Sequence, residues 1–544
     1  NLKIKNQYGM TEEIHFERLV IAAYRLPFKF NKTKKGYKAA QNSGGLVSAI
    51  LALSENFKKS DANGFKDKII WTGIADNLPD NFSSKKFDNE YFDLVPVILP
   101  QHLNDLFYGG FCNDLIWPLF HYFPSYSVFN YSYFQAYKEA NSKFCDEIVK
   151  VIKPGDFIWV HDYQLMLLPE MIREKLPGAT IEFLLHIPFP SFEIFRLMPR
   201  LWREAIINGM LGADLVGFHT HDYTQHFIKS VRRTVGYECR QNIIYSPNNL
   251  VKADAFPIGI DYNKYHSACL DEHVLIEKQK IKKNLFGQKL IFSVDRLDYS
   301  KGLLLRLNGY ETFLEKYPQW HSRVVFNMVV VPSRVNIEKY KEMKQEIEST
   351  VGRINGKYSS LAWRPIIYQF KSLSFNEMVA LYDLSDVGLI TPLRDGMNLV
   401  AKEYVACQIE NKGVLILSEM AGAAAELNEA LIINPADNIE MAEAIFKALE
   451  MGTEEKHIRL ERMQNRISSY NVFTWALDFF NQTSDIKQQQ NLMSVRFIKK
   501  TISSHIISDY QNSVHRILFL DYDGTLVSFA KYPEMATINK NTLG

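Results

Sequence analysis

Two cationic side chains lie close together in a loop that follows an apolar run. Arg296 and Lys301 are five residues apart in SVDRLDYSKG, directly after the run KLIF. A helix N-terminus carries partial positive charge and repels cations, so a bound anion explains why cations gather there. The pair predicts a diphosphate site. The other interpretation is a solvated loop in which Asp295 and Asp298 form surface ion pairs with the two cations.

A second group of polar residues follows the apolar run DVGLI. Asp395 and Gly396 form a turn in TPLRDGMNLVAKEY, and a helix that opens at Asn398 offers free backbone amides to an anion. Glu403 falls within the first two turns of that helix. Each of these residues alone also has a structural interpretation, because Asp-Gly turns are common and glutamate is a usual helix former.

Polar residues also end two apolar runs in the first half of the chain. His161 and Asp162 follow DFIWV, and His186 follows IEFLL. Gly44 and Gly45 precede an apolar helix and would let a backbone approach a phosphate or a sugar, although a plain turn explains them equally well. Ligands bind at the carboxyl ends of parallel strands, so these groups together predict a substrate cleft between facing domains.

The elements that must position these residues alternate along the sequence. Apolar β-branched and aromatic runs are each followed by a helical pattern, as in KLIFSVDRLDYS before KGLLLRLNGYETFLEKY. This alternation indicates parallel sheets covered on both faces, and the number of strands predicts two α/β domains. The boundary is expected near residue 265, where a charged helical stretch begins a second series. The polar, glutamine-rich segment 484–512 predicts a linker.

The composition excludes several classes of protein. The 544 residues include 63 Lys and Arg against 61 Asp and Glu, and a net charge of +2 creates no global field toward nucleic acid or an anionic membrane. The five cysteines include no C-x-x-C pair, and no apolar run approaches the roughly 18 residues that span a bilayer. The start also lacks a signal-peptide pattern. Together these features predict a cytoplasmic enzyme without nucleic-acid or membrane partners.

Several longer blocks resemble those of a known family. WPLFHY, IWVHDYQLMLLP, FLLHIPFPSFEIFR, FSVDRLDYSKGL and SDVGLITPLRDGMNLVAKEY, in this order, are similar to signature blocks of the trehalose-6-phosphate synthases, glycosyltransferase family 20. The similar blocks span roughly residues 15–480. The terminal ILFLDYDGTLV, with Asp521 and Asp523, resembles the first motif of haloacid-dehalogenase-type phosphatases, as in the trehalose-6-phosphate phosphatase half of two-domain fusions.

The resemblance implies a GT-B fold, in which two Rossmann-like α/β domains face each other across a deep cleft. Residues 1–265 would bind the acceptor, glucose 6-phosphate, and residues 266–470 the donor, UDP-glucose. A helix over 471–483 would cross back to the first domain. The segment 513–544 would be a truncated phosphatase start. Since only about 20 residues follow Asp523, we expect it to be inactive and poorly ordered.

The implied reaction is the first step of trehalose biosynthesis. Glucose is transferred from UDP-glucose to glucose 6-phosphate with retention of the anomeric configuration, which yields α,α-trehalose 6-phosphate and UDP without a metal or other cofactor. Two alternatives stay open: a related synthase with another acceptor, such as a glucosylglycerol-phosphate synthase, and a non-catalytic module that senses sugar phosphates. A homo-oligomer and an association with a trehalose-6-phosphate phosphatase are both compatible with the resemblance.

The resemblance also assigns residues to each substrate. The implied donor residues are Gly44, Gly45, His186, Arg296, Lys301, Leu373, Asp395, Leu399, Val400, Ala401, Lys402 and Glu403. The implied acceptor residues are Arg25, Tyr108, Trp117, Asp162 and Arg334. The implied catalytic set is Arg296, Lys301, His186, Asp162 and Asp395.

In this implied site, each residue would bind a different chemical group of the substrates. Arg296 and Lys301 would hold the diphosphate. Glu403 would hold the ribose hydroxyls, and Asp395 with His186 the hydroxyls of the transferred glucose. Arg25 and Arg334 would present guanidinium forks, which suit a phosphate monoester.

Overall fold

The computed structural model describes most of the chain. The described residues are 2–5, 11–14, 18–33, 36–41, 47, 50–53, 69–75, 92–247, 249–334, 338–494, 500–517 and the single positions 527, 532, 534 and 537. Gly44 and Gly45, two of the expected donor residues, lie outside the described residues, and so do Asp521 and Asp523. The chain divides into two compact units, Asn1–Gln489 and Gln490–Gly544.

A nine-stranded sheet forms the centre of the first domain in the described part of the chain. In spatial order its strands are β11 (Glu238–Arg240), β12 (Ile243–Tyr245), β13 (Leu250–Ala255), β10 (Leu215–Phe218), β9 (Thr180–Leu184), β8 (Phe157–His161), β3 (Leu19–Arg25), β6 (Ile69–Ile74) and β7 (Phe92–Val97). From β13 to β7 all neighbours run parallel, and β11 and β12 add an antiparallel edge. Two separate hairpins pair β1 (Leu2–Lys5) with β2 (Thr11–Ile14) and β4 (Phe28–Thr33) with β5 (Gly36–Gln41).

Both faces of this sheet are buried, which explains why its strands are apolar throughout. In β8, Phe157 and Trp159 belong to one core cluster, whereas Ile158 and Val160 belong to another on the opposite face. The helices of this half include α2 (Gln101–Asn104), the π-helix η2 (Asp105–Ile116), α3 (Trp117–Phe120), α4 (Tyr131–Val151), α5 (Leu168–Lys175), α6 (Phe192–Phe195), α7 (Arg200–Leu211) and α8 (His221–Thr234). It also contains the short 3-10 turns η3 (Pro124–Tyr126) and η4 (Tyr163–Leu165).

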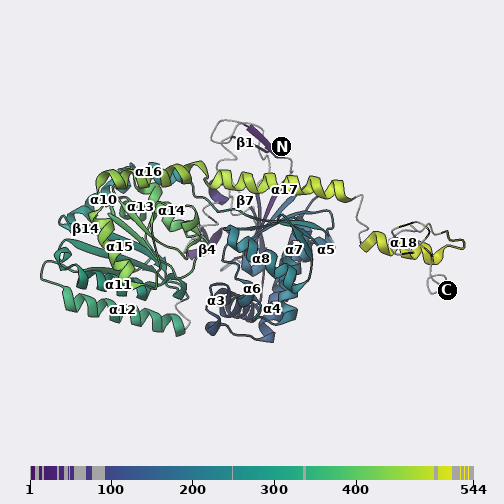
Figure 1. The fold of residues 1–544 in the computed structure, drawn as a ribbon, viewed down its shortest axis with the longest axis horizontal. Coiled ribbons are helices and arrows are strands. Elements are labelled where there is room, and N and C mark those ends of the chain that lie inside the picture. The colour runs from purple at the N-terminus through teal and green to yellow at the C-terminus, as the bar shows by residue number, and fades with distance from the viewer. Residues whose placement is uncertain are drawn as a thin grey trace. The chain divides into compact units, whose positions relative to one another are not determined.

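The second domain is built on a six-stranded, wholly parallel sheet (Figure 1). Its spatial order is β16 (Ile366–Phe370), β15 (Val324–Val331), β14 (Lys289–Arg296), β17 (Val387–Ile390), β18 (Val414–Ser418) and β19 (Leu431–Ile433). Its helices in the described residues are α9 (Tyr262–Ala268), α10 (Glu272–Leu285), α11 (Leu303–Lys316), α12 (Glu338–Tyr358), α13 (Phe375–Leu384), α14 (Leu399–Cys407), α15 (Asn438–Glu450) and α16 (Thr453–Ser469), with short turns η5 (Tyr299–Lys301), η6 (Pro318–Trp320) and η7 (Gly422–Ala425). The order reverses between β14 and β17, so the loops after these two strands lie side by side, where such sheets bind ligands.

Helix α17 (Val472–Ser494) returns to the first domain (Figure 1). The indole nitrogen of Trp475 donates to the carbonyl of Phe256 at 3.3 Å. A Cβ at Gly217 of β10 would lie 2.3 Å from the ring of Phe479, so only glycine lets the helix approach this closely. Further along, Thr483 donates to the buried Glu182 of β9. These contacts join the end of the second domain to the first sheet.

The segment 484–512, which we expected to be a linker, contains the boundary between the two compact units, and much of it is helical. Helix α17 continues to Ser494, and α18 covers Lys500–Asn512. The physical reason in α17 is packing: Ile486 is buried, and the ammonium of Lys487 lies 2.9 Å from Asp214 Oδ2. A glutamine-rich composition predicts solvent exposure, but it does not detect a few anchoring side chains at helical spacing.

None of the helices in the described part combines the length and apolar character needed to cross a bilayer. All five cysteines carry free, buried thiols.

We expect Trp475→Ala to destabilise the protein by about 3–5 kcal/mol, the usual cost of emptying a large buried aromatic site. The Trp475 ring lies 5.2 Å from that of Trp159 and is fully buried. Leu492→Ala, on the same helix at a side chain that is 71% exposed, is the matched control and should cost little. Urea unfolding measures both; equal losses would mean that α17 is not anchored through this ring.

Candidate functional site

A buried ion pair joins the two polar loops of the second domain. Lys301 Nζ lies 2.5 Å from Asp395 Oδ2, and Asn398 Nδ2 donates to the same oxygen at 3.1 Å. Lys301 ends η5, after β14, and Asp395 follows β17, so the neighbouring strands bring them together. Burial alone would raise the pKa of Asp395, but the charge and hydrogen bond of Lys301, together with His121 and Asn398, hold this pKa below its usual value.

Sequence reasoning missed the residue that supports this pair from behind. The guanidinium of Arg306 on α11 is fully buried. Its Nε donates to Thr391 Oγ1 at 3.0 Å, and its Nη2 donates to the carbonyl of Lys301 at 3.2 Å and lies 2.8 Å from Asp295 Oδ2. A single arginine inside the apolar helix LLLRL was the available signal, because a buried charge requires partners.

The start of α14 contributes backbone and apolar contacts. Asn398 begins the helix with a positive φ of 78°, and its side chain accepts from the amide of Ala401 at 3.1 Å. Leu399 and Val400 are partly buried and pack against the same core cluster as Leu373, which lies between β16 and α13.

Two expected donor residues on α14 use their side chains differently. Lys402 turns away from the loops: its ammonium donates to the carbonyl of Ile258 at 2.8 Å and pairs with Glu426 at 2.5 Å. Each carboxylate oxygen of Glu403 accepts one tyrosine hydroxyl at 2.9 Å, from Tyr265 and Tyr382. Burial raises the pKa of Glu403, although these hydrogen bonds oppose the shift. Each oxygen keeps a second lone pair for a ligand.

The indole of Trp117 in the first domain meets two arginines of the second. The guanidinium carbon of Arg334 lies 4.8 Å from the Trp117 ring centre, and that of Arg296 lies 5.8 Å away. Arg334 also reaches across the domains, because its Nη2 donates to Asn113 Oδ1 at 2.8 Å. Asn113 was missed in the sequence, where nothing separates it from an ordinary surface asparagine.

Further contacts cross the domains near Asp395. The Tyr223 hydroxyl of α8 donates to the carbonyl of Asp395 at 3.3 Å. A Cβ at Gly396 would lie only 2.2 Å from the carbonyl oxygen of His186, so the backbones of the two domains touch here. The Arg394 guanidinium lies 4.0 Å from the ring centre of Tyr122. His186, Trp117 and the loops of the second domain are therefore parts of one site.

Asp162 and His186 lie together at the carboxyl edge of the first sheet. Asp162, with a positive φ of 74°, accepts the backbone amide of His186 at 3.2 Å. Burial raises the pKa of Asp162 to about 7, although that amide, the amide of Tyr163 and the charge of Arg296 lower it. A carboxyl whose pKa lies near neutrality can hold or release a proton under ordinary conditions.

His186, which is partly buried, lies in a row with the buried imidazoles of His161 and His219. Its Nε2 lies 3.1 Å from Nδ1 of His161, and its ring centre lies 5.2 Å from that of His219. Burial lowers the pKa of His161 to about 3 and that of His219 to about 4, and it holds the pKa of His186 well below its ordinary value. The row is therefore uncharged near neutral pH and interacts through hydrogen bonds.

The expected acceptor residues Arg25 and Tyr108 also lie together. Tyr108 stacks on Tyr24 with 4.2 Å between ring centres, and the Arg25 guanidinium carbon lies 5.8 and 5.9 Å from these two rings. The Tyr24 hydroxyl donates to Asn104 Oδ1 at 3.0 Å.

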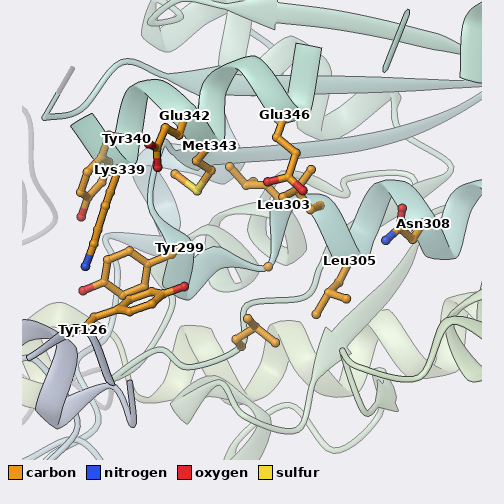
Figure 2. A pocket seen from close by; sticks show the side chains of 13 residues that line it. Tyr126, Tyr299, Leu303, Leu305, Asn308, Lys339, Tyr340, Glu342, Met343 and Glu346 are labelled. Atoms are coloured by element: carbon orange, nitrogen blue, oxygen red, sulfur yellow. The ribbon is translucent and has the colours of Figure 1, made fainter. Parts of the chain in front are cut away.

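A cavity of about 620 Å³ adjoins the site on the side of α11 and α12. Tyr126 of the first domain and Tyr299 of the second lie at one end of it, where Lys339 and Tyr340 project from α12 (Figure 2). The ring centres of Tyr126 and Tyr299 are 5.2 Å apart. Tyr126 thus forms a further contact between the domains, with Tyr299 and Lys339.

The sequence is similar to proteins of a known family over most of its length. The sequence model of glycosyltransferase family 20 matches residues 17–485. The chain belongs to glycosyltransferase family 20. A similar curated protein is a bifunctional trehalose-6-phosphate synthase/phosphatase of Thermoproteus tenax, 40% identical over 523 residues, which cover 95% of this chain and 71% of that protein. The 56 kDa subunit of a UDP-forming α,α-trehalose-phosphate synthase of Saccharomyces cerevisiae is 40% identical, over 85% of this chain and 93% of that one.

Solved structures of this glycosyltransferase family confirm the predicted GT-B fold. An E. coli structure described as bound with UDP-2-fluoro glucose has a TM-score of 0.77 and 33% identity, over 87% of this chain and 99% of that one. A UDP-forming α,α-trehalose-phosphate synthase of Burkholderia xenovorans in complex with glucose 6-phosphate has a TM-score of 0.77 and 31% identity, over 86% and 100%. Among the residues described for this family 20 chain, no three metal-ligating side chains lie together.

The row of neutral imidazoles predicts a loss of stability in acid. An unfolded histidine has a pKa near 6.5, so between about pH 6.5 and 4 the unfolded chain binds protons that the folded His161 and His219 do not. Stability should therefore fall as pH falls through this window. Urea unfolding gives the free energy of unfolding at each pH, and its slope against pH reports how many more protons the unfolded chain binds than the folded one. For His219→Gln this number should be smaller by about one, whereas for the exposed His273→Gln it should equal that of the wild type. Parallel slopes for all three proteins would contradict the assignment.

Proposed function

We propose that this chain transfers glucose from UDP-glucose to glucose 6-phosphate and so forms α,α-trehalose 6-phosphate and UDP. The observation that carries the proposal is a cluster of three cations at the junction of the two domains. Arg296 and Arg334 of the second domain meet Trp117 of the first, and Lys301 lies beside Asp395. The two substrates carry a diphosphate and a phosphate monoester, so this site has cations for both. The relatives described as UDP-forming synthases add independent support.

On the donor side, Arg296 and Lys301 bind the diphosphate of UDP-glucose at the end of β14. The helix α14 presents backbone amides of Leu399 and Val400 toward the same charge, whereas the amide of Ala401 is held by the Asn398 side chain. Glu403 accepts hydroxyl groups of the ribose with its remaining lone pairs. We include Lys402 only through its backbone, because its side chain is engaged with Ile258 and Glu426.

The sugar hydroxyls and the acceptor occupy the other half of the site. Asp395 and His186 accept or donate to the hydroxyls of the transferred glucose, and Asp162 lies beside them. Arg334 and Arg25 bind the phosphate of glucose 6-phosphate, with Tyr108 and Trp117 against its ring. Support for Arg334 in this role is its burial, since a desolvated guanidinium binds a phosphate strongly.

The proposed transfer is a front-face substitution with retention. The bond between C1 of glucose and the β-phosphate oxygen breaks, and a bond from C1 to the O1 hydroxyl oxygen of glucose 6-phosphate forms on the same face. The proton of that hydroxyl passes to the departing β-phosphate. Charge develops on this phosphate, where Arg296 and Lys301 are already oriented, and such preorganised donors typically supply a few kcal/mol each. We propose that these cations replace a metal ion.

Two alternatives lead to different outcomes. A related synthase would accept another phosphorylated acceptor, such as glycerol 3-phosphate. A sensing module would bind glucose 6-phosphate without turnover, but such a module has no need for the oriented donor cations. We place the reaction in the cytoplasm, which the free buried thiols support. A homo-oligomer or an association with a trehalose-6-phosphate phosphatase is compatible with this role.

The test is release of UDP from UDP-glucose by the purified full chain. UDP should appear only when glucose 6-phosphate is present, and proton NMR of the product should show two α-anomeric protons, one on each glucose unit of the single 1,1-linkage. UDP release with glycerol 3-phosphate and not with glucose 6-phosphate would favour the related synthase. Binding of glucose 6-phosphate without UDP release would favour the sensing module.

Arg296→Ala should lower turnover by about 10²-fold or more, the scale of losing one transition-state donor. Its side chain is exposed, so the melting temperature should stay unchanged. Arg323→Ala is a matched control, because Arg323 is also exposed and its guanidinium carbon lies 4.7 Å from the ring centre of Trp320. This control should keep full activity. If Arg296→Ala lowered the melting temperature along with the turnover, the role of Arg296 would be structural.

Metal removal gives a separate prediction. Treatment with EDTA should leave the rate of UDP release nearly unchanged, since Arg296, Lys301 and the amides of α14 stabilise the leaving diphosphate. Activity that disappears with EDTA and returns with Mg²⁺ or Mn²⁺ would contradict the metal-free mechanism.

A further inference from the structure

Arg334 is held by oxygen atoms from both domains. Its Nη1 donates to the Tyr340 hydroxyl at 2.6 Å and to Asp298 Oδ2 at 3.3 Å, and its Nη2 donates to Asn113 Oδ1 at 2.8 Å. Tyr340 lies on α12 and Asp298 precedes η5, whereas Asn113 belongs to η2 of the first domain. The orientation of this guanidinium is therefore defined by the protein itself.

The Tyr340 hydroxyl links Arg334 to the donor-side loop. It accepts from Arg334 and donates to Asp298 Oδ2 at 3.4 Å. The other oxygen of Asp298 accepts the backbone amide of Ser300 at 2.9 Å and its hydroxyl at 2.8 Å. Ser300 directly precedes Lys301, so one chain of hydrogen bonds connects Arg334 with the loop that carries the donor cations.

The ring of Tyr340 is fixed by its surroundings, and its hydroxyl faces the guanidinium. Tyr340 is only 4% exposed. Figure 2 shows it in the wall of the cavity, beside Lys339 and next to the end where Tyr126 and Tyr299 lie. Its ring centre is 6.0 Å from that of Tyr299, and Lys339 Nζ lies 4.4 Å from the ring centre of Tyr126. A ring packed in this way holds its hydroxyl at a constant position.

Arg334 needs such support for two reasons. Its backbone has a φ of 51°, in the left-handed region that ordinary residues seldom adopt, so local backbone preference does not favour its placement. A long arginine side chain also loses much rotamer freedom when it binds a phosphate, and a partner that fixes it beforehand removes that loss from the binding step.

We propose that Tyr340 is a positioning residue for the acceptor phosphate: its hydroxyl holds the Arg334 guanidinium in the orientation that binds it. This inference rests on the proposed function, in which Arg334 binds the phosphate of glucose 6-phosphate. Tyr340 acts through Arg334 and does not contact the substrate. If Tyr340 only filled space, its ring would matter and its hydroxyl would not.

A double-mutant cycle tests this directly. Tyr340→Phe keeps the ring and should raise the half-saturating glucose 6-phosphate concentration about tenfold, the scale of one hydrogen bond to a charged group. The maximal rate and the half-saturating UDP-glucose concentration should change less than about twofold. In the Arg334→Ala background, the same Tyr340→Phe change should have almost no further effect. Tyr310→Phe is the control, because its buried hydroxyl donates to the carbonyl of Pro365, outside the site.

Titration calorimetry of glucose 6-phosphate in the presence of UDP provides a readout that is independent of turnover. The same tenfold weakening is expected for Tyr340→Phe, and none for Tyr310→Phe. Equal weakening by Tyr340→Phe with and without Arg334, or no weakening at all, would overturn the inference. A wild-type protein that neither binds glucose 6-phosphate nor releases UDP would instead contradict the proposed function.

Discussion

The buried ion pair between Lys301 and Asp395 is the interaction on which the rest of the site depends. Removing two charges from water is costly, and a buried pair is retained only where hydrogen bonds satisfy its remaining groups. Here the Asn398 side chain donates a hydrogen bond to the carboxylate of Asp395, and Arg306 donates one to the backbone carbonyl of Lys301. The pair also couples the ends of β14 and β17. Asp395 keeps the Lys301 ammonium in a poorly solvated position. In the proposed function, Lys301 exchanges part of its interaction with Asp395 for one with the diphosphate.

The second constraint is that neither domain holds the site alone. The close approach of Gly396 to His186, and the hydrogen bond from Tyr223 to the carbonyl of Asp395, join the domains near the end of β17. Arg334 joins them a second time through Asn113 and Trp117. Helix α17 anchors the end of the second domain on the first sheet through Trp475. Because these contacts hold the two domains together, side chains of both domains can contact the same pair of substrates.

The sequence predicts the groups whose positions follow from local rules. Apolar runs followed by helices predict both sheets, and the carboxyl-end rule places Arg296, Lys301 and Asp395 together without knowledge of the fold. Contacts between distant residues are not accessible in this way. Arg334 and Asn113 are 221 residues apart, and only the packing of the two domains brings them within hydrogen-bond distance. A sequence motif also does not state where the Lys402 side chain points: its ammonium contacts the carbonyl of Ile258 and the carboxylate of Glu426. Composition alone also did not show that Ile486 and Lys487 anchor the start of the expected linker as part of α17.

The most direct test is a crystal structure of the full chain with UDP and glucose 6-phosphate bound. The account predicts the diphosphate within about 3 Å of Arg296 and Lys301, and the phosphate monoester at the same distance from Arg334, with Tyr340 still bonded to that guanidinium. A diphosphate bound away from the ends of β14 and β17, or a glucose 6-phosphate that leaves Arg334 in contact only with protein oxygens, would contradict it.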